Sequence, residues 1–259
     1  MAQEKTELTE VEFDEIVAKH KFNKQLLLKD YLLTRALYLM KDIEDIYFKG
    51  GTALNKMFLS HARLSEDIDL TITGQMDKIK AQITKCLSAD KRFGKVTTDK
   101  DMTEFVRMVV PYTEFGSSGT IFVDLNAKAK LFMKPQEYPI AHYYPNIPKF
   151  SFRALDIHEL IAEKMRATIS RNKPRDHLDL YYIIKAGLPM DMKLVELKCK
   201  DADVPYDIEK MFNKAKTLHK RWFDDIEPLL VEQITFEEVM TTLAKHFKLK
   251  DVKEAKKIK

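Results

Sequence analysis

The sequence predicts an α+β fold in which a mixed sheet with helices is followed by a wholly helical C-terminal part. Apolar, β-branched runs bounded by glycine clusters occur only in the first part of the chain. Beyond residue 150 the apolar residues recur three or four apart, which is the spacing of amphipathic helices. A chain of 259 residues can hold two domains, and we expect them to span residues 1–150 and 151–259.

Helices and strands alternate in the first half. The expected elements are, in order, a helical segment over 8–42, a strand over 46–48, a helix that begins at Lys49-Gly50-Gly51-Thr52, a strand over 67–72 with alternating polar and apolar side chains, a helix over 76–89, and a hairpin of strands 105–112 and 120–125 joined by residues 116–119.

The second half is introduced by a segment with four prolines, residues 134–149, which reads as a linker or crossing loop. One helix is expected to open near Asp156 and another to end near Gly187, a residue type typical of helix C-termini. Two further helices are expected near 206–221 and 235–248.

Composition narrows the class of protein. Two cysteines cannot supply a disulfide framework, and no apolar run approaches the roughly 20 residues that span a bilayer. The N-terminus is acidic where a secretory signal would be basic and then apolar. We therefore expect a cytoplasmic protein with no membrane partner. The formal charge of +4 is too small to indicate nucleic-acid binding by itself.

The Gly50-Gly51-Thr52 segment lies between an expected strand and an expected helix. Paired glycines let the backbone approach a ligand closely and direct N–H groups at an anion beside a helix N-terminus. The spacing is not that of a P-loop, and a glycine pair alone is more often a tight turn.

Asp67 and Asp69 lie two apart in an expected strand, so both carboxylates share one face and could hold a divalent ion. Asp99/Asp101 and Asp201/Asp203 have the same spacing, but only the first pair has Ile68, Leu70 and Ile72 on the opposite face. Two carboxylates this close repel each other without a cation. Asp124, in another expected strand, is a candidate third metal ligand or an edge-strand carboxylate that faces water.

The third candidate group lies in the helical half. Lys164 is placed near the apolar face of its helix, where a lysine either extends to solvent or reaches into a cleft that could hold a phosphate. Asp176 and Asp179 are one turn apart near a helix N-terminus. Their structural alternative is helix capping and an ion pair with Arg171 or Arg175.

Four of these segments occur in an order that resembles a known family. They are Gly-Gly-Thr-Ala-Leu from Gly50, Arg-Leu-Ser-Glu-Asp-Ile-Asp-Leu from Arg63, Glu163-Lys164, and Arg-Asp-x-x-Asp-Leu-Tyr from Arg175. With Lys29-Asp30-Tyr31 as a lead-in, the sequence resembles the AbiEii/AbiGii-type nucleotidyltransferase toxins over roughly residues 25–185. These are the toxins of bacterial toxin–antitoxin and phage-abortive-infection systems.

The resemblance implies a polymerase-β-like nucleotidyltransferase fold, an NTP substrate, Mg²⁺ or Mn²⁺ as the metal, and a cognate antitoxin as a partner. It implies transfer of a nucleotide to an RNA acceptor, with the 3′ end of tRNA as the expected site. Carried over residue by residue, it assigns the triphosphate to Lys49, Gly50, Gly51, Thr52, Ser65 and Lys164, the metal to Asp67 and Asp69 with Asp124, and catalysis to Asp67, Asp69, Lys164, Asp176 and Asp179. The common pattern has serine where Gly51 or Thr52 stands here, but backbone N–H groups do most of that work.

Two alternatives remain open at this stage. The acceptor could be a protein hydroxyl or a small molecule, or the chain could be a catalytically silent protein that binds a nucleotide or a partner. The basic residues Arg166, Arg171, Lys173 and Arg175 favour RNA, although they could serve the triphosphate alone. Seven lysines between Lys245 and Lys259 are read as a solvated end rather than a nucleic-acid arm.

Overall fold

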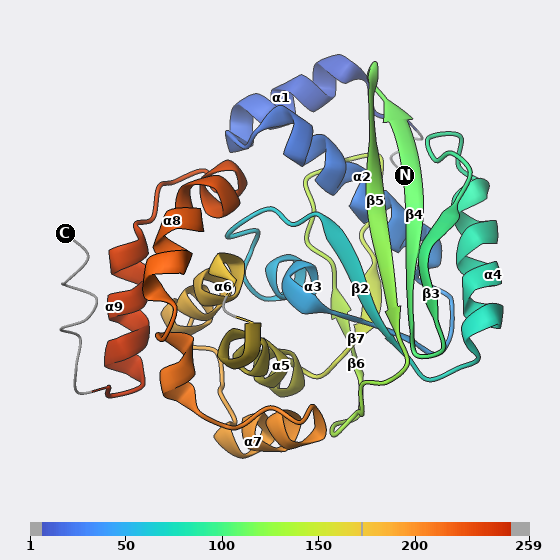
Figure 1. Cartoon of the computed structure of the whole chain (residues 1–259). Coiled ribbons are helices and arrows are strands. Elements are labelled where there is room, and N and C mark those ends of the chain that lie inside the picture. The colour runs from blue at the N-terminus through green and yellow to red at the C-terminus, as the bar shows by residue number, and fades with distance from the viewer. Residues whose placement is uncertain (1–6, 172, 250–259) are drawn as a thin grey trace. The chain divides into compact units, whose positions relative to one another are not determined.

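The computed structural model describes residues 7–171 and 173–249 and divides the chain into two compact units, residues 1–155 and 156–259 (Figure 1). The lysines from 250 onward, which we read as a solvated end, lie outside the described residues. The boundary follows strand β7 (Ser151–Ala154), whose Ala154 pairs with Phe48 of β1. The first unit therefore runs beyond the expected boundary at residue 150, because its sheet needs β7.

The first unit is built on a seven-stranded mixed sheet in the order β3-β4-β5-β2-β1-β7-β6. β1 pairs with β2 in antiparallel fashion, whereas β2–β5 and β1–β7 are parallel pairs. The strands are β1 Ile46–Lys49, β2 Asp67–Ile72, β3 Thr97–Met102, β4 Phe105–Glu114, β5 Ser117–Asn126, β6 Gln136–Pro139 and β7. This confirms the expected mixed sheet with helices.

Four helices of the first unit accompany this sheet: α1 Glu10–His20, α2 Lys24–Met40, α3 Gly50–Met57 and α4 Met76–Ser88. The expected helical stretch over 8–42 is two helices. Lys21 ends α1 in a left-handed conformation (φ 59°), and the Asn23 side chain accepts hydrogen bonds from the first backbone N–H groups of α2. α2 packs against α4 and β5, which places its buried leucines in the core beneath the sheet.

The hairpin of β4 and β5 is tighter than the sequence suggests. Its turn is Phe115-Gly116, with φ values of 47° and 69°, and not the four residues 116–119. Positive φ at both positions suits the twist of a two-residue hairpin. Phe115 adopts this conformation, and its ring stacks on the Phe13 ring with 5.2 Å between the two ring centroids. Gly119 is a strand residue that pairs with Tyr112, and a Cβ at this position would overlap the Tyr112 side chain.

Three strands, β3, β6 and β7, lie where none was expected. The segment 134–149 is not a linker, because Gln136–Pro139 form β6 and pair with β7. β3 has no apolar alternation because all six of its residues are exposed, so only its pairing with β4 identifies it. Proline at the end of β6 is tolerated because β6 is an edge strand.

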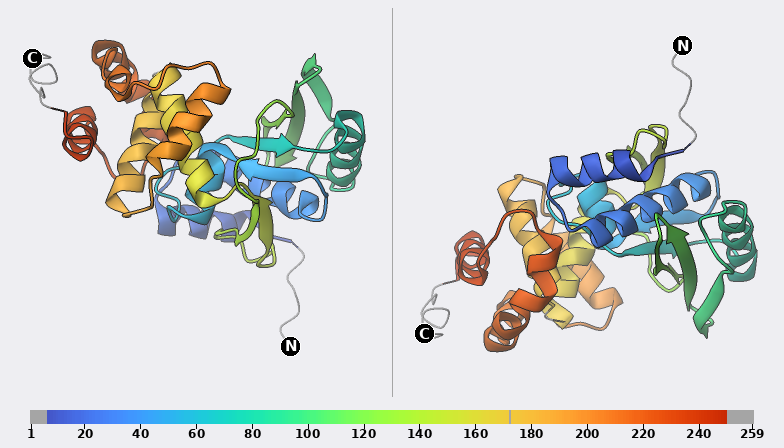
Figure 2. Two further views of the ribbon diagram at one scale, coloured as in Figure 1. Left: turned by 90° about the horizontal axis from the view of Figure 1, so that it is seen from below. Right: turned by 90° about the horizontal axis from the view of Figure 1, so that it is seen from above.

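The second unit is helical, as predicted. Its helices are α5 Ile157–Arg171, α6 Pro174–Lys185, α7 Met192–Asp201, α8 Ala215–Ile226 and α9 Phe236–His246, with two short 3₁₀ turns at Ile208–Met211 and Glu227–Leu229. α5 packs against α6 and α7, and α6 packs against α8 and α9 (Figure 2). The helix expected over 206–221 begins later and runs further, because Leu218, Trp222 and Ile226 continue one apolar stripe. α7 was not predicted.

Within the described part of the chain, no helix combines the length and apolar character needed to cross a membrane. Cys86 and Cys199 are both free thiols.

A buried polar network joins α2, α3 and the loop after β6. The Lys56 Nζ lies 2.8 Å from Asp30 Oδ1 and donates to the Thr34 hydroxyl at 2.8 Å, while the Tyr144 hydroxyl donates to Asp30 Oδ2 at 2.8 Å. Burial raises the pKa of Asp30, but the attraction of Lys56 outweighs it and leaves the pKa below its ordinary value. Because each charge is compensated, the network fixes the position of α3 against α2.

His61 adds a pH dependence to this network. Burial, assisted by the Lys56 ammonium at 3.5 Å, lowers the pKa of His61 to about 4. Between about pH 6.5 and pH 4 the unfolded chain therefore binds a proton that the folded chain does not, so the free energy of unfolding falls as the pH falls. At ~1.4 kcal/mol per pH unit, His61 accounts for a loss of about 3 kcal/mol over this window.

We expect His61→Asn to remove that part of the pH dependence, since Asn tolerates the left-handed backbone at this position (φ 58°) and does not titrate. Urea unfolding of wild type and variant at pH 7 and pH 4.5 measures the difference, and His246→Asn, at an exposed position, is the control. Parallel pH profiles for wild type and His61→Asn would contradict this account.

Candidate functional site

The antiparallel pairing of β1 with β2 places the glycine turn beside the Asp-x-Asp strand. Lys49, the last residue of β1, is the register partner of Asp69. α3 begins at the next residue, Gly50, so the chain passes from strand to helix without an intervening loop. The backbone of this turn therefore lies directly against the carboxylate-bearing part of β2.

Gly50 is required here for two independent reasons. Its φ of +78° is a conformation that side-chain-bearing residues rarely adopt, and a Cβ at this position would overlap the Asp69 carboxylate oxygen Oδ2. The Asp69 carboxylate is thus packed against the α-carbon of the turn. The glycine at this turn does let the backbone approach another group closely, as the sequence predicted. Within the protein, that group is the Asp69 carboxylate.

The start of α3 is held by side chains that bind backbone atoms. The Thr52 hydroxyl donates to the Asp67 carbonyl oxygen at 2.6 Å and lies 2.7 Å from the Ser65 Oγ. Asn55 Nδ2 donates to the Gly51 carbonyl oxygen at 2.9 Å. Thr52 is buried, so its hydroxyl positions β2 and Ser65, while its backbone N–H belongs to the first turn of α3. The N-cap residue, Lys49, makes no capping hydrogen bond with its side chain, and the positive dipole at this helix N-terminus attracts anions.

Asp67 and Asp69 project from the same face of β2, as the alternation predicted, because Ile68 and Leu70 between and after them are fully buried on the other face. Burial raises the pKa of Asp67 above its ordinary value, with Lys29 acting in the opposite direction. A raised pKa indicates that the protein itself compensates this carboxylate incompletely. A cation would supply the missing compensation.

Asp124 lies on β5 beside Asp69, and its carboxylate is bound by another side chain of the protein. It is the register partner of Asp69 on β5, and both of its carboxylate oxygens accept hydrogen bonds from Arg107 of β4, at 2.8 Å from Nε and 2.6 Å from Nη2. This bidentate pair uses the oxygens that a metal would need. No local pattern indicates Arg107, because only strand pairing places it opposite Asp124.

The donor set fits a Mg²⁺ ion that completes its shell with substrate and water. Within residues 7–171 and 173–249, no group of three or more His, Cys, Asp or Glu side chains is arranged to hold a metal. Mg²⁺ is commonly held by one or two carboxylates together with substrate phosphates, and Asp67 and Asp69 provide such a pair beside the anion-attracting helix terminus of α3.

In the second unit, Lys164 of α5 is buried between two carboxylates of α6. Its Nζ lies 2.8 Å from both Asp176 Oδ1 and Asp179 Oδ2. Arg171 adds two hydrogen bonds to Asp176, from Nε at 2.7 Å and from Nη2 at 2.8 Å. Burial opposes ionisation of Asp176, but Lys164 and Arg171 outweigh it and hold its pKa well below the ordinary range. The ion pair of Asp176 with Arg171, given above as the structural alternative, is therefore present, and Lys164 joins it by pairing with both carboxylates, a contact that the sequence did not predict.

The predicted residues thus form two groups, each assembled within its own unit. In the first unit, Lys49, Gly50, Gly51, Thr52, Ser65, Asp67 and Asp69 come together where β1, α3 and β2 meet, with Asp124 alongside. In the second, Lys164, Asp176 and Asp179 form the buried cluster. Sequence reasoning missed Asn55, which binds the backbone of Gly51 and Arg63 nearby in the chain, and Arg107, whose partner is set by strand register.

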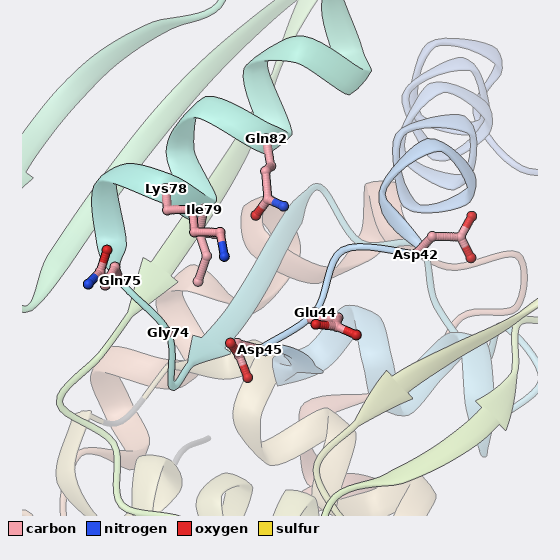
Figure 3. A pocket seen from close by; sticks show the side chains of 8 residues that line it. All are labelled: Asp42, Glu44, Asp45, Gly74, Gln75, Lys78, Ile79 and Gln82. Atoms are coloured by element: carbon pink, nitrogen blue, oxygen red, sulfur yellow. The ribbon is translucent and has the colours of Figure 1, made fainter.

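A separate pocket of about 460 Å³ lies at the end of β1 and β2 that is opposite to Gly50 and Asp69 (Figure 3). Its lining includes Asp42, Glu44, Asp45 and Lys78, from the segments that precede β1 and follow β2. Its excess of acidic groups would repel a triphosphate, and none of its eight lining residues is a predicted site residue. The pocket therefore does not compete with the site at Gly50 and Asp69.

Comparison with known proteins places these features in a family. The model of the family described as nucleotidyl transferase AbiEii toxin, type IV toxin–antitoxin system, matches residues 31–245. That range contains both residue groups and most of each unit. No curated protein matches the sequence significantly.

Two solved structures share the fold. MenT4, a nucleotidyltransferase toxin from Mycobacterium tuberculosis H37Rv, matches with a TM-score of 0.70 at 18% identity, covering 96% of this chain and 93% of that one. JHP933 from Helicobacter pylori matches with a TM-score of 0.61 at 19% identity, covering 88% of this chain and 92% of that one. The mixed sheet followed by a helical part is thus a fold already seen in nucleotidyltransferase toxins.

We expect Gly50→Ala to destabilise the protein more than a glycine substitution that meets no obstacle. Gly116→Ala is the matched control, because Gly116 also has a positive φ (+69°) but no atoms near its missing Cβ. Both variants incur the left-handed backbone cost of about 1–2 kcal/mol, and Gly50→Ala adds roughly 1–3 kcal/mol for the overlap with Asp69. Urea unfolding compares them, and equal losses of stability would show that Asp69 does not press against Gly50.

A second expectation concerns the buried lysine. Lys164→Ala leaves Asp179 buried without its 2.8 Å partner, so we expect a loss of about 3–5 kcal/mol in the free energy of unfolding. Lys193→Ala, on the exposed side of α7, should change it by less than about 0.5 kcal/mol. Urea denaturation followed by circular dichroism distinguishes them, and a loss below 1 kcal/mol for Lys164→Ala would mean that the cluster is not closed in solution.

Proposed function

The chain belongs to the AbiEii nucleotidyltransferase toxin family, and we propose that it transfers a nucleoside monophosphate from an NTP to an RNA acceptor, the 3′ end of tRNA. Membership makes the chain a nucleotidyltransferase toxin of a type IV toxin–antitoxin system, which implies a cognate antitoxin. The choice of acceptor, the dependence on Mg²⁺ or Mn²⁺ and the residue roles below are part of the proposal.

One observation supports the proposal most strongly: the turn at Gly50 packs against Asp69 while an uncapped helix N-terminus begins at the same residue. Such a turn offers backbone N–H groups to a polyanion beside two carboxylates that can share a metal with it. The combination suits an NTP better than an uncharged ligand, because a triphosphate needs both positive dipoles and a divalent ion.

In this proposal the N–H groups at the start of α3 bind the triphosphate, with Ser65 held beside them by Thr52. Asp67 and Asp69 hold the metal, which stabilises the charge that develops on the phosphates. The acceptor hydroxyl oxygen attacks the α-phosphorus and loses its proton, the bond from the α-phosphorus to the bridging oxygen breaks, and pyrophosphate leaves.

As the family resemblance implies, we also propose that Lys164 neutralises charge on the triphosphate. Asp176 and Asp179 hold its Nζ at a fixed position by two contacts of 2.8 Å. In this proposal a lysine fixed in this way acts by its charge. Asp176 and Asp179 would therefore contribute to catalysis by positioning Lys164.

RNA is favoured as the acceptor by the positive charge on the two helices that carry this cluster. Arg166 and Arg171 belong to α5, Lys173 immediately precedes α6, and Arg175 lies in its first turn. Arg171 is engaged by Asp176, and Arg166 and Lys173 add positive charge that could attract a phosphate backbone. A protein hydroxyl or a small molecule would not require this excess.

We expect Asp67→Asn and Asp69→Asn each to abolish nucleotide transfer while leaving the fold intact. Either change removes a metal-binding charge but also relieves repulsion between neighbouring carboxylates. Asp201→Asn is the control, because Asp201 and Asp203 share the two-residue spacing but lie at the end of α7. The assay incubates each protein with Mg²⁺ and α-labelled NTPs together with total cell RNA and total cell protein, and melting temperatures report folding.

Label on RNA with the wild type and Asp201→Asn, but not with the two β2 variants, supports the whole proposal. Label on protein alone would overturn the RNA acceptor and keep the transferase. Transfer at near-normal rates by Asp67→Asn or Asp69→Asn would contradict the roles given to these carboxylates.

A further inference from the structure

The sheet face that carries the two carboxylates continues over β5 and β4. Strand register aligns Asp69 with Asp124 and Asp124 with Arg107, and it aligns Asp67 with Phe122 in the neighbouring row. Because side chains opposite one another in a sheet lie on the same face, Arg107 and Phe122 share the surface of the carboxylates. Neither residue has a role in the proposed chemistry so far.

Arg107 is fixed in place by its neighbours. Its Nε and Nη2 donate to the two oxygens of Asp124, and its Cζ lies over the Phe122 ring at 4.9 Å from the centroid. The Asp124 side chain is 11% exposed, whereas that of Arg107 is 28% exposed. The carboxylate therefore anchors a guanidinium group that remains partly accessible.

The occupied edge of Arg107 limits what this surface can recognise. Arginine binds a phosphate best through the paired N–H groups of its fork, and here Nε and Nη2 of that fork are used by Asp124. Nη1 and the second N–H of Nη2 are left as donors, and the flat face of the guanidinium and the half-buried Phe122 ring are left as stacking surfaces. Flat cationic and aromatic faces are surfaces on which nucleobases stack.

We propose that Arg107 and Phe122 form a nucleobase-stacking site beside Asp67 and Asp69. This inference rests on the proposed function, since the reacting phosphate must then lie at the same carboxylates. The stacked base belongs either to the incoming NTP or to the terminal nucleotide of the acceptor RNA. Asp124 serves this site as a positioning residue, because it holds the guanidinium.

Two conservative variants test the site. Phe122→Leu keeps an apolar side chain without a π face, and Arg107→Lys keeps the charge without the plane. Loss of a base–aromatic stack weakens nucleotide binding by roughly 5- to 100-fold. Tyr38→Leu is the matched control, because Arg35 Cζ lies 5.9 Å from the Tyr38 ring on α2, another arginine–aromatic contact. Melting temperatures of all three variants confirm that they fold.

Dissociation constants are measured without transfer, in two arms. The first compares each of the four NTPs with inorganic tripolyphosphate in the presence of Mg²⁺. The second uses a short 5′-labelled RNA, with and without a base on its 3′-terminal ribose. A loss confined to NTPs assigns the site to the incoming base, and a loss confined to RNA with an intact terminal base assigns it to the acceptor.

Unchanged affinities in both arms, or losses equally large for tripolyphosphate and abasic RNA, would overturn the stacking site. Wild-type protein that binds these ligands but transfers no nucleotide would count against the proposed function alone, because the two arms need no turnover. Wild-type protein that binds neither ligand would overturn both.

Discussion

The close approach of Gly50 to Asp69 is the constraint on which the functional region of the first unit depends. The register of β1 with β2 sets Lys49 opposite Asp69, and the absence of a Cβ at Gly50 lets α3 begin at once beside that carboxylate. The start of α3 then positions Thr52, whose hydroxyl binds the Asp67 backbone and contacts Ser65. A helix N-terminus, a serine and two carboxylates are thereby placed together without a flexible loop, so little ordering is left for the moment of ligand binding.

Buried ion pairs organise both units, and their importance lies more in position than in stability. Lys56 with Asp30 fixes α3 against α2, and Lys164 with Asp176 and Asp179 fixes α5 against α6. A buried pair gains little over apolar side chains of similar size, but loss of one partner leaves an uncompensated charge. Such pairs therefore hold a geometry that apolar packing alone would specify less sharply. In the first unit this geometry determines where the backbone of α3 begins, and in the second it determines where the ammonium of Lys164 is held.

Much of the fold and the proximity of several candidate site residues could be predicted, because they follow from local patterns. Alternation in β2 indicated that Asp67 and Asp69 share a face, and the glycine pair indicated a tight strand-to-helix turn. What could not be predicted depends on partners distant in the chain. β3 is polar and exposed throughout and is a strand only through β4. Arg107 has no local signature, and its two hydrogen bonds to Asp124 are set by antiparallel register, so the sequence did not indicate that the expected metal ligand also holds an arginine. Phe115 in the hairpin turn could not be expected from propensity, since its ring packing on Phe13 is a tertiary contact.

The central claim is that Asp67, Asp69 and the turn at Gly50 support attack on the α-phosphorus of an NTP. The position of the transferred label tests it most directly. The protein is given an acceptor RNA with an NTP labelled at either the α- or the γ-phosphate, and pyrophosphate release is measured in parallel. The account predicts incorporation of the α-label only, with one pyrophosphate released for each nucleotide added. Incorporation of the γ-label, or release of inorganic phosphate in place of pyrophosphate, would contradict it.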